Sequence, residues 1–129
     1  MPVIKRFEDI LAWQKARELT RLVYRVTGEG AFARDYALRD QIRRAAISVQ
    51  SNIAEGYARE GDREFRYLLG VAKGSVAEVQ SQLYVALDAE LIQRETFDEA
   101  YELAAEVGRL VGGFIGYLSQ SAPQVRQAK

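Results

Sequence analysis

The stretch from residue 35 to residue 59 constrains the fold most, because its apolar residues follow helical spacing on two separate faces. One face recurs in steps of three and four residues, through Leu38, Ile42, Ala45, Val49, Ile53 and Gly56. The other face carries Tyr36, Ile47 and Ala54. A helix with two apolar faces must be covered on more than one side. The stretch therefore predicts packing within the chain and also against another copy of it.

Three further stretches have helical periodicity, at residues 8–27, 62–89 and 96–118. Asp35 is the expected N-cap of the second helix, and Thr96 opens an expected capping box with Glu99. Connections of roughly six to eight residues favour antiparallel neighbours. We therefore predict an all-α fold, an antiparallel up-down-up-down four-helix bundle over residues 1–118. A flexible tail is expected over residues 119–129.

Small residues recur at four-residue spacing in the third and fourth helices, at Gly70, Gly74, Gly108, Gly112 and Gly116. Each interior glycine costs a helix about 1 kcal/mol relative to alanine. The spacing therefore favours a close approach of two helix backbones. The alternative is a loosely packed C-terminal helix.

A polar stripe follows the second helix through Gln41, Arg44, Ser48, Asn52, Glu55 and Arg59. It predicts a hydrogen-bonded polar layer that fixes helix register, in which Glu55 pairs with Arg59 one turn on or with Arg44 from another helix. We expect Glu78, beside the apolar seam of the third helix, to be partly buried against an arginine. No histidine, cysteine or lysine lies at helical reach of Ser48, so the stripe does not indicate hydrolysis.

The chain has no cysteine and no histidine, which excludes disulfides, thiolate chemistry, the usual zinc sites and Ser-His pairs. We expect no catalytic residue, no metal, no cofactor and no small-molecule substrate. Residues 1–9 lack the apolar region of a signal peptide, so a cytoplasmic location is expected. The longest apolar run, residues 110–118, is too short for a membrane span.

Formal net charge is zero, but the charges are unevenly distributed. The first 44 residues are rich in basic side chains, whereas residues 74–107 contain one basic residue, Arg94, among many acids. Candidate nucleic-acid-binding residues are Arg17, Arg21, Arg39, Arg43 and Arg44, which form rows on the first two helices. The alternative is charge pairing between these rows and the acidic segment 88–106, within or between subunits.

Large aromatic residues also lie outside the expected core. Trp13 and Tyr24 fall about 100° or more from the buried stripe of the first helix, close to its arginines. The candidate oligomer interface therefore comprises Trp13, Tyr24, Tyr36, Ile47 and Ala54. Ordinary packing at the bundle edge and base stacking with nucleic acid are the two alternatives.

The central run QIRRAAISVQSNIAEG, residues 41–56, resembles the four-helix bundle family also known as intervening-sequence proteins of large-subunit ribosomal RNA. Downstream the resemblance continues through Arg59, Glu64, Phe65, Leu69, Ala72, Gly74, Ser75 and Glu78. Upstream it is carried by Trp13, Ala16, Leu19, Tyr24, Phe32, Tyr36 and Leu38. It covers roughly residues 7–118. The chain departs from the family pattern at Ala33 and Gln50, where proline is common, and at residues 88–90.

The resemblance implies a left-handed up-down bundle that assembles into a ring-shaped homopentamer. A related branch, the accessory protein of diversity-generating retroelements, forms a basic pentameric barrel that binds nucleic acid and the reverse transcriptase. The expected function is accordingly that of a non-catalytic scaffold that binds RNA or a nucleoprotein. The alternative is a structural or protein-interaction module whose charged faces are used between subunits.

Overall fold

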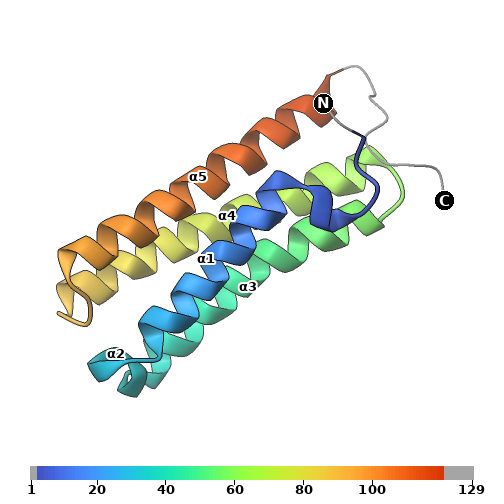
Figure 1. The fold of residues 1–129 in the computed structure, drawn as a ribbon. Helices are drawn as coiled ribbons and strands as arrows, with labels where there is room; N and C mark the ends of the chain where they lie inside the picture. Colours follow the sequence, from blue (N-terminus) through green and yellow to red (C-terminus); the bar gives the residue numbers. More distant parts are fainter. Residues whose placement is uncertain (1–2, 121–129) are drawn as a thin grey trace.

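The computed structural model describes residues 3–120. Its first element is a short 3-10 helix, Phe7–Asp9. Five α-helices follow, namely α1 (Leu11–Thr27), α2 (Gly30–Arg34), α3 (Tyr36–Ala58), α4 (Asp62–Asp88) and α5 (Arg94–Ser119). The four long helices lie side by side and form the body of the molecule (Figure 1). The all-α prediction is confirmed.

The long helices pack in a closed circuit around one core. Both α1 and α4 pack against α3 and against α5, so α1 and α4 occupy opposite corners of the bundle. The predicted seams are buried, with Leu19, Ile53, Phe65, Leu69 and Val107 fully inaccessible. Burying a side chain of this size contributes about 1.5–3 kcal/mol, so the shared core is the main stabilising term.

One hydrogen bond joins α3 to α4 at the predicted polar layer, between Ser48 and Ser75. The Ser48 and Ser75 hydroxyls lie 2.8 Å apart, and Asn52 Nδ2 donates to Ser48 Oγ over 3.1 Å. One turn further on, Arg59 donates to the Glu55 carboxylate at 2.7 Å. The Ser48 and Asn52 bonds satisfy half-buried polar groups, so the predicted polar layer holds at these two residues, whereas Gln41, Arg44, Glu55 and Arg59 are exposed.

Local chemistry sets the helix ends. Asp35 caps α3 by accepting a hydrogen bond from the Leu38 N–H at 3.1 Å, as predicted. Gly61 has φ +95° between α3 and α4, a conformation that glycine adopts without steric cost. At the end of α4, Glu90 has φ +60°, and the Leu91 N–H donates to the Ala86 carbonyl at 2.9 Å. This is a Schellman ending with glutamate where glycine is usual.

Two predicted boundaries are wrong, and one short helix was not predicted. Helix α1 begins at Leu11, because Ile10 is buried in an extended backbone conformation. Tyr57 Oη donates a hydrogen bond to the Ile4 carbonyl, and this bond holds the segment before Ile10 across the bundle. The additional helix α2 forms because its Phe32 side chain is buried. Helix α5 begins at Arg94 with Gln93 at the N-cap, so Thr96 lies inside the first turn and does not form the expected capping box.

The glycines of α4 and α5 do not bring two backbones together within residues 3–120. A Cβ on Gly70, Gly74 or Gly116 would meet no atom within 4 Å, and one on Gly108 would touch only a side-chain atom of Val76 at 3.4 Å. Most of these glycines instead line an open groove of about 780 Å3 between α4 and α5. The expectation of close backbone approach is therefore wrong inside one chain.

Two further expectations concern the surface and the tail. Glu78 is exposed, so the expectation of a partly buried carboxylate is wrong. The predicted flexible tail, residues 119–129, lies outside the described residues except for Ser119, which ends α5, and Gln120. The proposed boundary at residue 118 stays a prediction.

Candidate nucleic-acid interface

The candidate arginines lie on α1 and α3, which pack against each other. Two hydrogen bonds fix their register: Thr20 Oγ1 donates to the Ala46 carbonyl at 3.3 Å, and Arg43 Nε donates to Thr27 Oγ1 at 2.8 Å. The C-terminal half of α1 therefore lies beside the N-terminal half of α3. We call Arg17 and Arg21 of α1 with Arg39, Arg43 and Arg44 of α3 the basic face.

Three arginines of the basic face cover aromatic rings. The guanidinium carbon of Arg43 lies 4.4 Å from the ring centre of Tyr24, which links α3 to α1. Arg39 lies 4.8 Å from the ring centre of Tyr36 within α3. Arg17 lies 5.9 Å from that of Trp13 within α1. Three of the arginines assigned to nucleic acid thus lie on the same surface as three of the aromatic residues assigned to an oligomer interface.

The five arginines differ in how many donors remain free. Arg39 donates to Asp40 at 3.0 Å and to the Ala33 carbonyl at 3.1 Å, so it mainly ties α2 to α3. Arg17, Arg21 and Arg44 are exposed and form no hydrogen bond or ion pair with any residue in the range 3–120. Arg44 points about 100° further round α3 than Arg43, away from α1.

Charge pairing with the acidic segment occurs, but outside the basic face. Arg25 of α1 lies 3.8 Å from Glu99 of α5, and Lys15 lies 3.8 Å from Glu106. All four side chains are exposed to solvent to a substantial degree, so each pair contributes about 1 kcal/mol or less. The pairing alternative therefore holds for Arg25, while Arg17, Arg21 and Arg44 have no carboxylate partner among the described residues.

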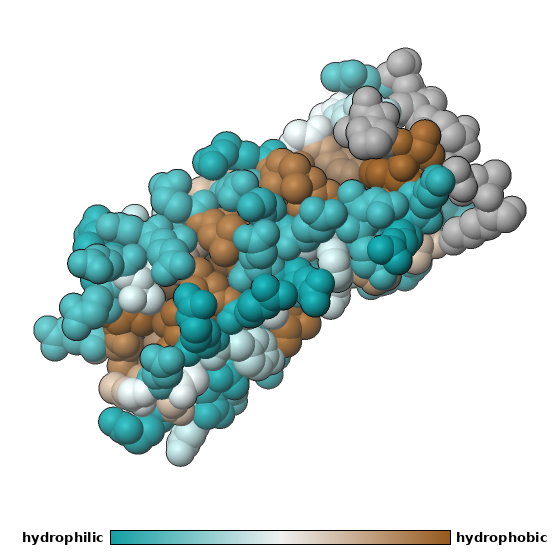
Figure 2. Space-filling model, in the orientation of Figure 1, coloured by the Kyte–Doolittle hydropathy of each residue, from teal (hydrophilic) through white to brown (hydrophobic). Residues whose placement is uncertain are grey.

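The candidate interface residues divide into exposed and half-buried side chains. Tyr24, Tyr36 and Ile47 are 43%, 64% and 42% exposed. Trp13 is half-buried, packing edge-on against Phe7 at 5.1 Å, and Ala54 is also half-buried. In Figure 2, apolar side chains interrupt the polar surface in several patches. Contact of these residues with a second subunit stays a prediction.

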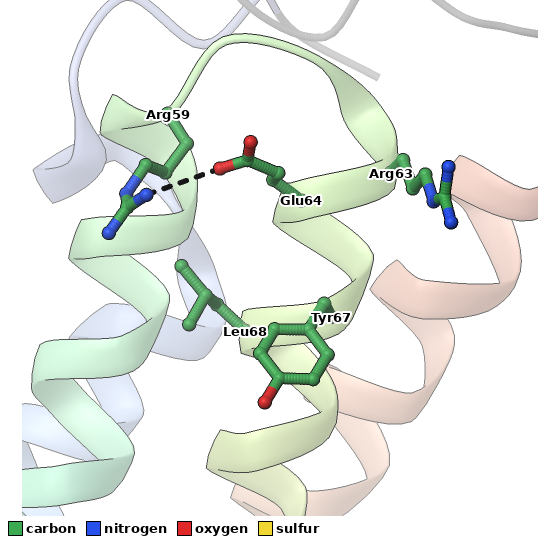
Figure 3. A pocket seen from close by; sticks show the side chains of 5 residues that line it. All are labelled: Arg59, Arg63, Glu64, Tyr67 and Leu68. Atoms are coloured by element: carbon green, nitrogen blue, oxygen red, sulfur yellow. Dashed lines mark hydrogen bonds and ion pairs between the residues drawn. The ribbon is translucent and has the colours of Figure 1, made fainter.

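A hollow of about 530 Å3 at the α3–α4 turn was missed by sequence reasoning. Arg59, Arg63, Glu64, Tyr67 and Leu68 line it (Figure 3). Arg59 bridges Glu55 and Glu64, and the hydrogen bond that Arg59 donates to the Glu55 carboxylate is the main cause of the raised pKa of Arg59. No local pattern in the sequence marks this hollow, because it depends on how Arg59 and the start of α4 come together across the turn.

Neither a metal site nor a membrane span is found in the described part. Within residues 3–120, no group of three or more carboxylates is placed to hold a metal ion. No helix in that range is both long and apolar enough to cross a bilayer.

The fold and the basic face define a small all-helical bundle protein with an arginine-bearing surface. The chain belongs to the 23S rRNA-intervening sequence protein family, whose model matches residues 8–113. No curated protein matches it. A crystal structure of a protein of unknown function, from the S23 ribosomal protein family of Bacteroides thetaiotaomicron, has the same fold. It is 21% identical, with a TM-score of 0.76, and the match covers 82% of this chain and 96% of that one.

Proposed function

We propose that this protein is a non-catalytic, homo-oligomeric scaffold that binds RNA or a nucleoprotein through the basic face. The observation that carries the proposal is the exposure of Arg17, Arg21 and Arg44 without a carboxylate partner in residues 3–120. Unpaired guanidinium groups bind phosphate oxygens through charge-assisted hydrogen bonds and release counterions from the nucleic acid. The family name, which refers to 23S rRNA, supports RNA as the ligand.

The aromatic contacts are compatible with this role. A guanidinium that stacks on a ring uses its flat face, so its in-plane N–H groups stay available to phosphate. Arg17 has all of these donors free, and Arg43 uses only Nε, on Thr27. Tyr24 and Tyr36 also offer rings on which unpaired bases can stack.

The proposed assembly is a left-handed, up-down-up-down bundle that forms a ring, placed in the cytoplasm. The register of α1 against α3, with Thr27 beside Arg43 and Thr20 beside Ala46, supports opposite directions for these two helices. Ile47 supports a subunit contact, because a large aliphatic side chain that is 42% exposed on α3 loses water on association. Ribosomal RNA is a cytoplasmic ligand, which fits this location.

A second candidate is a structural or protein-interaction module that binds no nucleic acid. It is favoured by the zero net charge and by the pairs Arg25–Glu99 and Lys15–Glu106, in which basic side chains of α1 meet acids of α5. In a ring, the free arginines of one subunit would meet such acids on its neighbour. Dedicated nucleic-acid-binding domains more often have a clear excess of positive charge.

The decisive experiment measures binding of labelled, mixed-sequence single-stranded RNA by fluorescence anisotropy at several salt concentrations. We expect affinity to fall steeply with salt. The triple variant Arg17→Glu, Arg21→Glu, Arg44→Glu should bind at least about tenfold more weakly and should show a shallower salt dependence, by roughly two in log–log slope. The matched control reverses Lys5, Lys73 and Arg109, which are also exposed and form no ion pair with any residue from 3 to 120, and should change the affinity little.

Molecular mass by light scattering separates the two candidates. If the triple variant keeps the native mass and loses RNA, the scaffold binds nucleic acid through this face. If the variant loses mass, or if the native protein binds no RNA at low salt, the arginines act between subunits and the RNA proposal is wrong.

A further inference from the structure

Exposed residues follow one face of α4 from end to end, and their sequence pattern is complementary to its own reverse. These exposed residues recur in alternating steps of four and three, which is the spacing of a coiled-coil seam. They are Arg63, Tyr67, Gly70, Gly74, Ala77, Ser81, Tyr84 and Asp88. This outer seam lies opposite the buried seam that contains Phe65 and Val79. Among residues 3–120 no helix covers it, because α3 and α5 flank α4 and α1 lies at the opposite corner.

Residues equally distant from the midpoint of the seam, between positions 75 and 76, are complementary to each other. Arg63 corresponds to Asp88, which carries the opposite charge, and Tyr67 corresponds to Tyr84. Nearer the midpoint, Gly74 corresponds to Ala77. In an antiparallel pair of helices, these are the residues that meet in successive layers.

The charged and aromatic side chains of the seam are available for contact with another chain. Arg63 and Asp88 form no ion pair with any residue from 3 to 120, and Figure 3 draws the Arg59–Glu64 pair but none to Arg63. Tyr67 is 71% exposed. Tyr84 is 50% exposed, and Phe97 and Tyr101 of α5 hold its ring at 4.9 and 5.7 Å. Aromatic rings with this much exposed surface gain contact area on association, and their side chains lose little conformational freedom.

We propose that the outer seam of α4 binds the same seam of a second copy, antiparallel, about a two-fold axis. A two-fold contact uses one patch twice, so the patch must be complementary to its own reversed copy, and the outer seam meets this condition at its charged ends. The Gly74–Ala77 layers let the two helices approach closely at the centre, where no side chain of the chain itself fills the space at Gly74. The partner is therefore this chain rather than an unrelated protein.

This contact is additional to the proposed ring and leaves α1 uncovered. A single pair of helices buries less accessible surface than stable complexes do, for which about 1,200 Å2 is the lower end. The association is therefore weak and depends on protein concentration. Rings joined back to back through α4 would present their α1 helices outward. The contact between two α4 helices does not require RNA binding.

The test exchanges the charges at the ends of the seam. Arg63→Asp alone places acid opposite acid, and Asp88→Arg alone places arginine opposite arginine. Both substitutions suit the helix dipole, since acids are favourable in the first turn and bases in the last, so both variants should fold. Sedimentation velocity over a concentration series should show that each variant needs at least about tenfold higher concentration to associate. An equimolar mixture of the two should associate as the native protein does.

Two controls make the result decisive. Glu102→Arg on α5 changes the net charge as Asp88→Arg does, at an exposed position away from the seam, and should leave association unchanged. Repeating the series with Ile47→Asp removes the proposed ring contact, and the seam-dependent step should persist. Native-like association of the single variants, failure of the mixture to recover, or an equal effect of Glu102→Arg would each overturn the proposal.

Discussion

Gly56 of α3 has less free space around it than any other glycine in residues 3–120. A Cβ at this position would lie 2.8 Å from Cδ1 of Phe65 on α4. The Phe65 ring is fully buried and packs against Phe114 at 5.1 Å, so it has no room to move away. The glycine therefore sets the spacing of α3 and α4.

We expect Gly56→Ala to lower the free energy of unfolding by about 1–2 kcal/mol, because overpacking outweighs the gain in helix propensity. Urea denaturation followed by circular dichroism measures the change. The control is Gly113→Ala on α5, where an added Cβ meets nothing within 4 Å. That substitution should stabilise the protein by up to about 1 kcal/mol, and equal effects at the two glycines would contradict the packing argument.

At the same scale, some contacts of the candidate site follow from the sequence and others do not. The pairs Trp13–Arg17 and Tyr36–Arg39 are predictable, because residues three or four apart meet on a helix surface. The stacking of Arg43 on Tyr24 depends on the register between two helices, which periodicity alone does not specify. Sequence reasoning therefore placed Trp13 and Tyr24 close to the arginines of the first helix but did not predict the contact between Tyr24 and Arg43.

The end of α4 has a strained backbone conformation. Glu90 has φ +60°, in the left-handed region where a side chain costs roughly 1 kcal/mol or more. The position is forced, because Leu91 and Glu90 donate to the Ala86 and Leu87 carbonyls and turn the chain toward α5.

Replacing Glu90 by glycine should raise the free energy of unfolding by about 0.5–1 kcal/mol, the relief of strain less the extra freedom of the unfolded chain. Thermal and urea denaturation both report this gain. The adjacent substitution Ala89→Gly is the matched control, because Ala89 has an ordinary φ of −83° and should lose stability. A gain at Ala89 as large as that at Glu90 would rule out strain as the cause.

Helix existence was predictable, whereas short segments and starting residues were not. The buried seam of α4 has uninterrupted helical spacing, and Asp35 marks the start of α3. Helix α2 has only five residues and forms because Phe32 finds a place in the core, which is a tertiary effect. The start of α5 lacks a side-chain cap, so no local signal distinguishes Arg94 from Thr96.

For the whole molecule, the outward apolar face of α3 predicts self-association. We expect Ile47→Asp to reduce the molecular mass in light scattering without loss of helical circular dichroism, because the side chain points to solvent in the single chain. Ile47→Val keeps an apolar group at the same place and should retain the native mass. If the native protein is a monomer at every concentration, the ring is wrong.

The sequence contains the composition of each surface but not the number of subunits that those surfaces join. Subunit number depends on the angle between neighbouring contacts, and no residue pattern within one chain specifies that angle. The outer seam of α4 shows the same limit, since its reversed pattern is visible in the sequence only after the structure places all of it on the surface.

The hydrogen bond from Tyr57 to the Ile4 carbonyl spans 53 residues of chain. The segment around Ile4 is thus fixed by a residue near the end of α3, and its carbonyl lacks this hydrogen bond until that helix has been made and has packed against α1. Residues synthesised before α1 and α3 therefore reach their final place only after these two helices have packed together.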